Sequence, residues 1–126
     1  MSSISDSAVV DTLRRQMAIA VAKQVASAGN LANVDTPGYK TKDVNFAETL
    51  KNKLSPGNST FPGATAPSGG VVMQDAEGLP VRRDGNNVQL DRELLSMSRA
   101  AGEFAQAQTA LAAKFRLVRY AINEGR

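Results

Sequence analysis

Hydrophobic and polar positions divide the chain into two periodic terminal segments and a polar, punctuated middle. The C-terminal segment has the clearest pattern, because its apolar side chains recur alternately four and three residues apart and only Gln108 interrupts the series. Such a heptad repeat is typical of a helix that packs against other helices. We predict a helix over 91–123 and a seam that serves as its assembly surface. The seam consists of Leu90, Leu94, Met97, Ala101, Phe104, Leu111, Phe115, Val118 and Ile122.

The N-terminal segment predicts a second helix over 6–33. Ser5, Asp6 and Ser7 are suitable N-cap residues, and no Pro follows before Pro37. At 1.5 Å per residue this helix would be about 40 Å long, too long for a small globule to cover. Many Ala residues smooth its surface and permit close approach of other helices. One broad face carries Val10, Leu13, Met17, Val21, Val25, Ala28 and Ala32.

The middle of the chain, residues 34–90, reads as turns and irregular structure. Residues 55–70 are rich in Pro, Gly and Ser and bury too little apolar surface to order themselves, so we expect a flexible segment. At most a short β-hairpin is expected here, with 71–73 against 80–82. Strong turn formers occupy 84–87. The fold class is therefore all-α, and the 126 residues fit a single domain, 1–126.

Composition argues against an enzyme. The chain has no Cys and no His, which removes disulfides, thiolate zinc sites, and the commonest metal ligand and general base. No nucleophile elbow, phosphate loop or dinucleotide motif is present. Trp is absent and only four Phe and two Tyr occur, so a large self-contained core is not expected. We predict no catalytic residue, no cofactor and no small-molecule substrate.

Charge and segment hydropathy narrow the partners further. The net charge of +3 comes from 15 basic and 12 acidic residues that are interspersed, so no basic stripe suits nucleic acid. Arg82-Arg83-Asp84-Gly85 either binds an anion or an acidic partner or is a solvated turn, and the turn is favoured. The carboxylates Asp75, Glu77, Asp84 and Asp91 lack the spacing of a calcium loop, so no metal site is predicted.

No cleaved secretory signal is visible at residues 1–6, and no apolar run is long enough for a membrane span. By itself this pattern indicates a cytosolic protein, although export through an uncleaved signal stays open. The lack of Cys would suit an oxidising compartment.

A compact turn is predicted where the N-terminal helix ends. Pro37 presets φ for the second turn position and Gly38 accepts the positive φ that follows, which is type II chemistry. On local physics alone, this segment is a helix-stopping turn and nothing more. The residues singled out are Asn30, Ala32, Asn33, Thr36, Pro37, Gly38 and Tyr39.

Two separated motifs resemble one protein family. Asn30-Leu-Ala-Asn33 followed by Thr36-Pro-Gly-Tyr-Lys40 is similar to the N-terminal signature of flagellar rod, hook and hook-associated axial proteins. Asp43-Val-Asn-Phe46 and the segment 84–93 resemble the proximal-rod members, the FlgB family. The resemblance covers most of the chain outside 52–80. Departures from the family pattern are Arg99-Ala100, where an Asn is expected, and Phe104, where a Tyr is usual.

The resemblance implies a structural subunit of the bacterial flagellar basal body. Its terminal helices would pair as an antiparallel, coiled-coil-like hairpin and polymerise into the proximal rod, part of the motor drive shaft. Partners would be copies of itself, homologous rod subunits, the basal-body adaptor protein and the inner-membrane ring. The location would be the periplasmic rod, reached through the flagellar type III export apparatus without signal cleavage.

Phe46 and Leu50 form a further candidate pair. An aromatic residue followed four positions later by an aliphatic one resembles the export-gate recognition pattern of rod and hook subunits. The same spacing is what one turn of amphipathic helix needs to dock on a core, and this is the simpler explanation.

A rival function stays open: a helical adaptor or regulator that forms a finite coiled-coil complex with one partner through the 90–122 seam. Size-exclusion chromatography and electron microscopy separate the two, because an adaptor stops at a defined stoichiometry whereas a rod subunit extends or joins homologous subunits.

Overall fold

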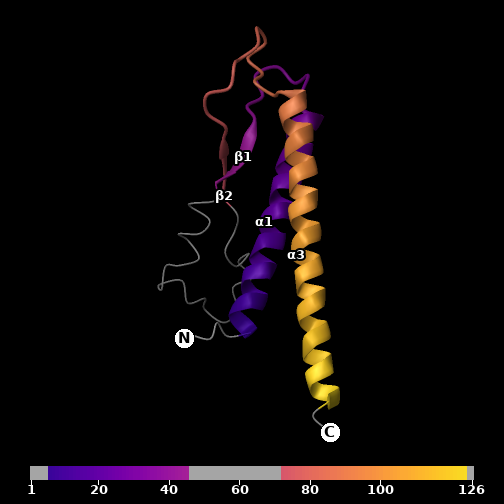
Figure 1. The fold of residues 1–126 in the computed structure, drawn as a ribbon. Coiled ribbons are helices and arrows are strands. Elements are labelled where there is room, and N and C mark those ends of the chain that lie inside the picture. Colours follow the sequence, from indigo (N-terminus) through magenta and orange to yellow (C-terminus); the bar gives the residue numbers. More distant parts are fainter. Residues whose placement is uncertain (1–5, 46–71, 125–126) are drawn as a thin grey trace, which may run out of the picture.

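The structure is a computed structural model that describes residues 6–45 and 72–124. Its elements in chain order are α1 (Asp6–Ala32), β1 (Lys42–Asn45), β2 (Val72–Asp75) and α3 (Leu90–Glu124) (Figure 1). Residues 1–5, 46–71 and 125–126 lie outside this description. The candidate export pair Phe46 and Leu50 and the Pro/Gly/Ser-rich stretch 55–70 therefore fall outside the described residues.

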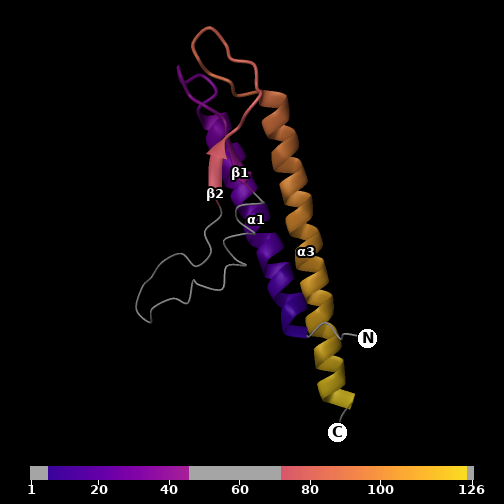
Figure 2. The ribbon, with the colours of Figure 1, turned by 90° about the vertical axis from the view of Figure 1, so that its left-hand side faces the viewer.

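Two long antiparallel helices dominate the molecule. Both views show α1 and α3 side by side along most of their length, and α3 continues past the start of α1 (Figures 1 and 2). The interior of α1 contains no Pro and many Ala, which favours a helix, and Pro37 disfavours helical geometry in the residue before it. The expected antiparallel helical hairpin is confirmed, and the described residues between the helices hold only short strands and turns. We call the end where α1 finishes and α3 begins the closed end.

A two-stranded antiparallel sheet lies beside α1 near the closed end (Figure 1). Its register pairs Lys42 with Asp75 and Asn45 with Val72. The expected partner of 71–73 was wrong, because β2 pairs with β1 and residues 80–82 form no strand.

The reason lies in the backbone of 80–82. Pro80 has no N–H to donate to a ladder. Arg82 already uses both backbone groups in a turn: its N–H donates to the Asn86 carbonyl (2.8 Å), and its carbonyl accepts from the Gly85 N–H (2.9 Å). Pro80 therefore lacks a ladder donor, and both backbone groups of Arg82 are already used within the turn.

Small and polar side chains fill the interior. Among the described residues, the buried apolar side chains are Ala20, Ala26, Val88, Ala100 and Ala107, and the buried polar ones are Ser27, Asn30, Thr41, Asn86, Asn87 and Glu93. Most large aliphatic and aromatic side chains of the helices are exposed or half-buried. This interior agrees with the weak core that composition predicts, and it leaves the large apolar groups to other surfaces.

Within the described residues, neither helix has an apolar stretch long enough to cross a bilayer.

Candidate functional site

The interface between the helices is a stripe of polar and small side chains. Hydrogen bonds and ion pairs join α1 to α3 at intervals, while Ala20, Ala100 and Ala107 let the backbones approach between them. We call the end of the hairpin opposite the closed end, where α1 begins, the open end. From the open to the closed end, the paired side chains are Asp6–Lys114 (2.6 Å), Lys23–Glu103 (3.2 Å), Ser27–Ser96 (3.0 Å) and Asn30–Glu93 (3.0 Å). The falling residue numbers on α3 fix the antiparallel register.

The predicted seam on α3 is not the stripe that faces α1. The inner stripe includes Glu93, Ser96, Ala100 and Ala107; the first three each precede a seam residue by one position, and Ala107 precedes Gln108, which interrupts the seam. Consecutive residues are about 100° apart around a helix. The seam is therefore rotated by roughly this angle from the face of α3 that contacts α1. Most of its large side chains stay exposed, including Leu94, Phe115 and Ile122. The seam therefore remains available to other molecules, and its role in assembly stays a prediction.

The predicted face of α1 is displaced in the same way. Ala20 and Ser27 are buried against α3, whereas their neighbours Val21 and Ala28 are exposed. Val25 is 60% exposed. Both helices thus turn small residues toward each other and keep part of their larger apolar side chains outside.

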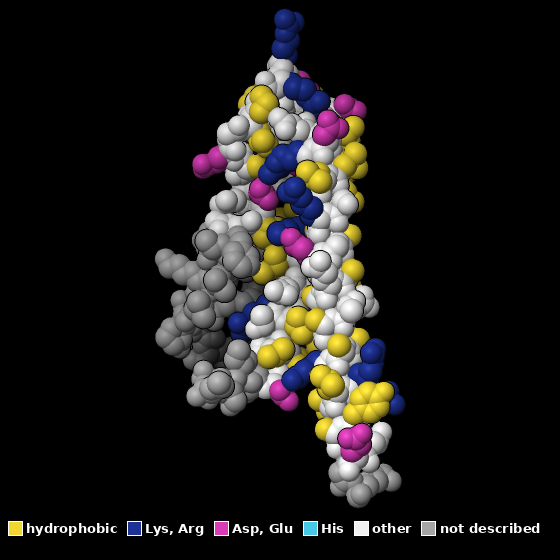
Figure 3. Space-filling view, viewed as in Figure 1, with side chains coloured by type: hydrophobic (Ala, Val, Ile, Leu, Met, Phe, Trp, Pro, Cys, Tyr) yellow, Lys and Arg dark blue, Asp and Glu magenta, His cyan; other side chains and the backbone are white. Residues whose placement is uncertain are grey.

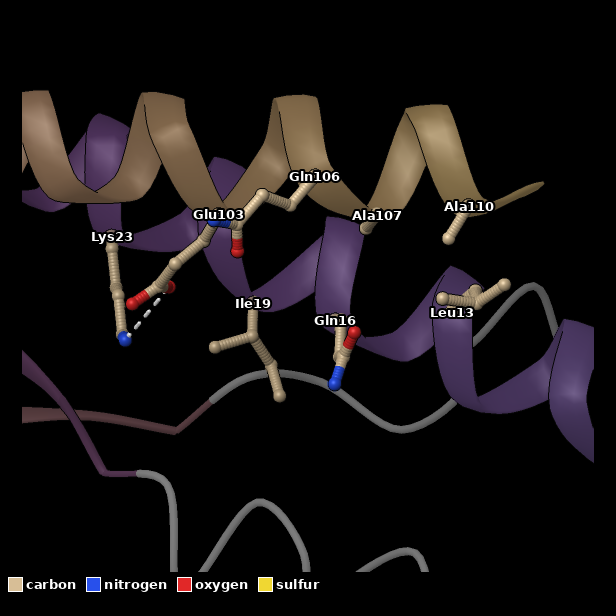
Figure 4. Close-up of a pocket in the computed structure, with 8 residues that line it drawn as sticks. All are labelled: Leu13, Gln16, Ile19, Lys23, Glu103, Gln106, Ala107 and Ala110. Carbon is tan, nitrogen blue, oxygen red and sulfur yellow. Dashed lines mark hydrogen bonds and ion pairs between the residues drawn. The ribbon is translucent and has the colours of Figure 1, made fainter. Parts of the chain in front are cut away.

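A shallow groove runs between the helices where small residues leave space. It has a volume of about 430 Å³ and is lined by Leu13, Gln16, Ile19 and Lys23 of α1 and Glu103, Gln106, Ala107 and Ala110 of α3 (Figure 4). The Lys23–Glu103 ion pair crosses it. The lining has no constellation suited to catalysis, so the groove is a feature of helix packing.

The family-type signature forms a polar corner at the closed end. The Asn30 side chain is fully buried and uses its whole hydrogen-bonding capacity. Its Nδ2 donates to the Lys42 carbonyl (2.9 Å) and to Glu93 Oε2 (3.0 Å), and its Oδ1 accepts from the Lys42 N–H (2.9 Å) and the Tyr39 hydroxyl (3.1 Å). Asn30 therefore holds α1, β1 and α3 together at one point.

The turn that follows α1 has the expected geometry. The Tyr39 N–H donates to the Thr36 carbonyl (3.2 Å), and Gly38 has φ of 74°. A type II turn is thereby confirmed. Upstream, Asn33 Nδ2 donates to the Gly29 carbonyl (2.8 Å) and its Oδ1 accepts from the Thr36 hydroxyl (3.2 Å), so Asn33 closes the end of the helix. Ala32 is the last residue of α1.

Asn86 links this turn to the segment before α3. From the sequence, Asn86 was predicted only to form a turn. Its buried Nδ2 lies within hydrogen-bond distance of three carbonyls, those of Asn33 (2.8 Å), Val34 (3.1 Å) and Thr36 (2.9 Å). Its Oδ1 accepts from the Val88 N–H (2.7 Å). These carbonyls lie in the turn that follows α1, so Asn86, from a distant part of the chain, holds that turn in place.

Neighbouring contacts complete the corner. Asn87 Oδ1 accepts from the buried Thr41 N–H (2.6 Å), and the Gly38 N–H donates to the Asp84 carbonyl (2.7 Å). Gly85 has φ of 82°, and a Cβ added there would lie 3.3 Å from the Gly38 Cα. The two loops therefore touch where a side chain would not fit without strain.

A buried carboxylate lies beneath the corner. Glu93 is 1% exposed, and it accepts from Asn30 and from Arg92 (2.8 Å). Arg92 also reaches Asp43 Oδ2 (2.9 Å), so it ties α3 to β1 as well as neutralising Glu93. Burial of such a group requires this compensation, which sequence spacing alone did not reveal.

At the sheet edge, the exposed Lys42 ammonium donates to Asp75. This hydrogen bond and the nearby carboxylate charge raise the pKa of Lys42.

The charged segment 82–85 forms the turn that was favoured for it. Arg82 donates to the Val34 carbonyl and lies 3.9 Å from Asp84, so it serves the turn. Among the described residues, no group of three or more acidic side chains is placed to hold a metal ion.

Known proteins similar to this chain share one description. No protein-family model matches the sequence. The flagellar basal body rod protein FlgB of Salmonella typhimurium (strain LT2) is 33% identical over 84 residues, a match that covers 56% of this chain and 61% of that protein. FlgB of Escherichia coli (strain K12) is 26% identical over 112 residues, covering 75% of this chain and 78% of that protein. FlgB of Yersinia enterocolitica is 30% identical over 84 residues.

The chain is similar to the FlgB rod proteins over more than half of its length. It spans about three fifths of the length of the Salmonella FlgB that it matches. The names of the FlgB relatives describe components of the flagellar basal-body rod and no enzymatic activity. The likeness to FlgB agrees with the resemblance carried by the motifs at 30–40 and 84–93.

Proposed function

We propose that this chain is a structural subunit of the flagellar basal-body proximal rod that polymerises through α1 and α3 to form part of the motor drive shaft. The observation that carries the proposal is the division of side chains in the hairpin. Small and polar groups join the two helices, while Leu94, Val25 and Phe115 remain half or more exposed. Exposed apolar side chains of this size on a helix pair favour contact with further protein.

Polymerisation follows from the shape of the surface. The exposed large apolar side chains lie on both helices, at Val21 and Val25 of α1 and near the two ends of α3. A surface of this kind suits several neighbours at once, and head-to-tail contacts that do not close produce a helical filament. The homology to FlgB supports a rod as that filament.

The corner at the closed end has a supporting role in this proposal. Asn30, Asn86 and Glu93 hold both helices and β1 in one arrangement through buried hydrogen bonds. A subunit whose helix pair is fixed at one end presents its outer faces in a defined relation to each other, as repeated packing requires. The signature residues from Asn30 to Tyr39 would then build the subunit and not contact the neighbours.

Location and partners belong to the same proposal. The subunit would work in the periplasmic part of the basal body, against other rod subunits, the adaptor protein and the inner-membrane ring. It would pass the flagellar type III export apparatus without loss of a signal peptide. Phe46 and Leu50 would serve export recognition, docking on the helix pair, or both in succession.

Deletion of the gene tests the proposal directly. Electron microscopy of basal bodies from the deletion strain should show no intact rod, and expression of the chain in that strain should restore it. Intact rods in the deletion strain would refute the assignment. A purified chain that stops at one fixed stoichiometry with a single non-rod partner would instead favour a finite helical adaptor.

Seam variants test the mechanism within that strain. Leu111→Asp or Phe115→Asp places an unpaired charge at a packed interface, so neither variant should restore rods. Thr109→Asp is a matched control, because Thr109 is exposed and lies more than about 100° around α3 from both Leu111 and Phe115. Normal rods with both seam variants would remove the seam from the mechanism.

A further inference from the structure

The closed-end corner contains a peptide bond with chemistry of its own. Asp84 and Gly85 form the only Asp–Gly pair in the sequence. In such a pair the glycine nitrogen can attack the carboxyl carbon of the aspartate side chain and close a five-membered ring. A side chain on the second residue hinders this ring closure, and glycine has none. The pair is therefore the position where the backbone of this chain most readily rearranges.

The rearrangement is an isomerisation that needs no oxidant or reductant. A bond forms between the Gly85 nitrogen and the Asp84 Cγ, and the carboxyl hydroxyl leaves as water with the proton of the Gly85 N–H. Water then adds to one of the two carbonyls of the cyclic imide. Addition at the side-chain carbonyl restores aspartate. Addition at the main-chain carbonyl breaks the bond from this carbon to nitrogen and leaves a β-linked chain that runs through Cγ.

In the folded corner, the three groups that take part in the reaction are hydrogen-bonded. The Gly85 N–H donates to the Arg82 carbonyl (2.9 Å), and the Asp84 carbonyl accepts from the Gly38 N–H (2.7 Å). The Asp84 carboxylate accepts from the Asn86 N–H (3.0 Å). Ring closure requires rotation of the Asp84 backbone and side chain, which breaks these hydrogen bonds together. The fold therefore opposes the reaction at the site where the sequence favours it.

Exclusion of water does not protect the pair. The Asp84 side chain is 40% exposed. Figure 3 shows acidic and basic side chains at the surface of the closed end, at the top of the view. Solvent that hydrolyses the imide can thus reach the site. Protection depends on the hydrogen bonds, and it lasts only while the corner stays closed.

A β-linked chain does not fit the closed corner. The linkage inserts the Asp84 Cβ into the main chain and converts the former main-chain carbonyl, the acceptor for Gly38, into a free carboxylate. A Cβ added to Gly85 would already lie 3.3 Å from the Gly38 Cα, so the two loops leave little room for a longer backbone. The Gly85 carbonyl, which accepts from Lys40 (2.9 Å), would move as well. The modification should therefore disfavour closure of the corner.

We propose that Asp84–Gly85 is a backbone modification site that isomerises when the corner is open and is protected when the corner is closed. A chain that stays unfolded accumulates the β-linkage, and the β-linkage then disfavours the fold. The inference uses only contacts within one chain, so it does not depend on the rod function.

Mass spectrometry of the purified chain tests the site, because electron-transfer fragmentation distinguishes β-linked from normal aspartate at residue 84. The chain and a synthetic peptide of residues 80–90 are incubated at neutral pH, in buffer and in concentrated urea. In buffer, the chain should isomerise at least about tenfold more slowly than the peptide, because reaction requires local opening. In urea, the two rates should agree within about twofold, since no corner remains. Equal rates of chain and peptide in buffer would overturn the protection.

The same chain supplies a control for the reactive pair. Asp75 is exposed and precedes Ala76, whose side chain hinders ring closure. In urea, Asp84 should isomerise at least about tenfold faster than Asp75, because only Asp84 precedes a glycine. Equal rates at the two aspartates would overturn the site.

A variant with an open corner tests the source of the protection. Asn86→Ala removes side-chain hydrogen bonds of the corner and leaves the Asp–Gly pair intact. Its isomerisation at Asp84 in buffer should be at least about fivefold faster than in the parent, because the corner opens more often. Asn123→Ala, exposed on α3, should match the parent. A parental rate in Asn86→Ala would overturn the role of the corner.

Pulse proteolysis tests the effect of the β-linkage on the fold. A partly isomerised sample is exposed briefly to protease in urea at the midpoint of unfolding of the parent. Surviving chains should contain at least about fivefold less β-linked aspartate than the starting sample, because a modest loss of stability shifts the folded fraction by this factor. Equal content before and after digestion would overturn the claim that the linkage disfavours the fold.

Discussion

The closed-end corner and the outer helix faces satisfy their side chains in opposite ways. In the corner, Asn30, Asn86 and Glu93 are buried and hydrogen-bonded within one chain. Along the helices, Val25, Leu94 and Ile122 are half or more exposed. A polar network of this kind is strongly directional, whereas apolar packing is not. The corner therefore holds the helix pair in one arrangement, and in the proposed function the faces provide the attraction to other molecules.

The largest expected effect is on the corner. Asn86→Ala removes the donor shared by three carbonyls and the acceptor for the Val88 N–H in a buried site. The loss of these hydrogen bonds, with the buried Val88 N–H left unpaired, should lower the free energy of unfolding by about 2–4 kcal/mol. Urea denaturation of the monomer, followed by circular dichroism, measures it. Asn123→Ala, exposed on α3, should stay within about 0.5 kcal/mol of the parent, and equal losses from both would contradict the role of the corner.

Glycine substitutions in the corner and on the outer face of α3 should change the stability of the monomer in opposite directions. Gly85→Ala meets both a φ of 82° and the Gly38 backbone, so it should destabilise the monomer by about 1–3 kcal/mol. Gly102→Ala on exposed α3 has open space and should stabilise it by about 0.5–1 kcal/mol. Thermal unfolding of the two variants compares them. The same sign for both would mean that the loops do not approach as described.

Substitutions on the faces should separate folding from association. Leu94→Ser replaces a side chain that is 51% exposed in the monomer. The free energy of unfolding of the monomer should change by less than about 0.5 kcal/mol, while rod formation in the deletion strain falls sharply. Destabilisation comparable to that of Asn86→Ala would show that Leu94 is already covered within the subunit.

The smallest effect concerns the ion pair across the groove. Lys23 and Glu103 are both partly exposed, with side-chain exposure of 34% and 50%. A double-mutant cycle with Lys23→Ala and Glu103→Ala should give a coupling of about 0.5 kcal/mol that weakens in salt. A coupling above about 2 kcal/mol would mean that ion pairs, and not small-residue packing, align the helices.

Periodicity predicts the helices well because it reflects burial over many residues. It does not predict which stripe faces which partner, since an assembly seam and an intramolecular seam carry the same heptad signal. Here the hairpin uses Ala100 and Ala107, seven residues apart, while larger apolar side chains such as Leu94, Leu111 and Phe115 dominate the heptad pattern. The recurrence of small residues at 20, 27, 100 and 107 was the available signal.

Long-range polar contacts could not be predicted from the sequence for a different reason. The turn at Pro37 and Gly38 could be predicted because its geometry depends on four adjacent residues. The partners of Asn86 lie about fifty positions away along the chain, and nothing in the local sequence indicates them. The β1–β2 pairing has the same character, since its two strands are separated by residues 46–71.

The central claim is that neighbouring molecules, and not the subunit itself, cover the outer helix faces. Thiol labelling of an Ile122→Cys variant tests it most directly, because the chain has no other thiol and Ile122 is 66% exposed. The purified monomer should react with a maleimide at the rate of an unfolded control, and the same residue in isolated basal bodies should react at least about tenfold more slowly. Equal rates in the monomer and in the rod would contradict the claim.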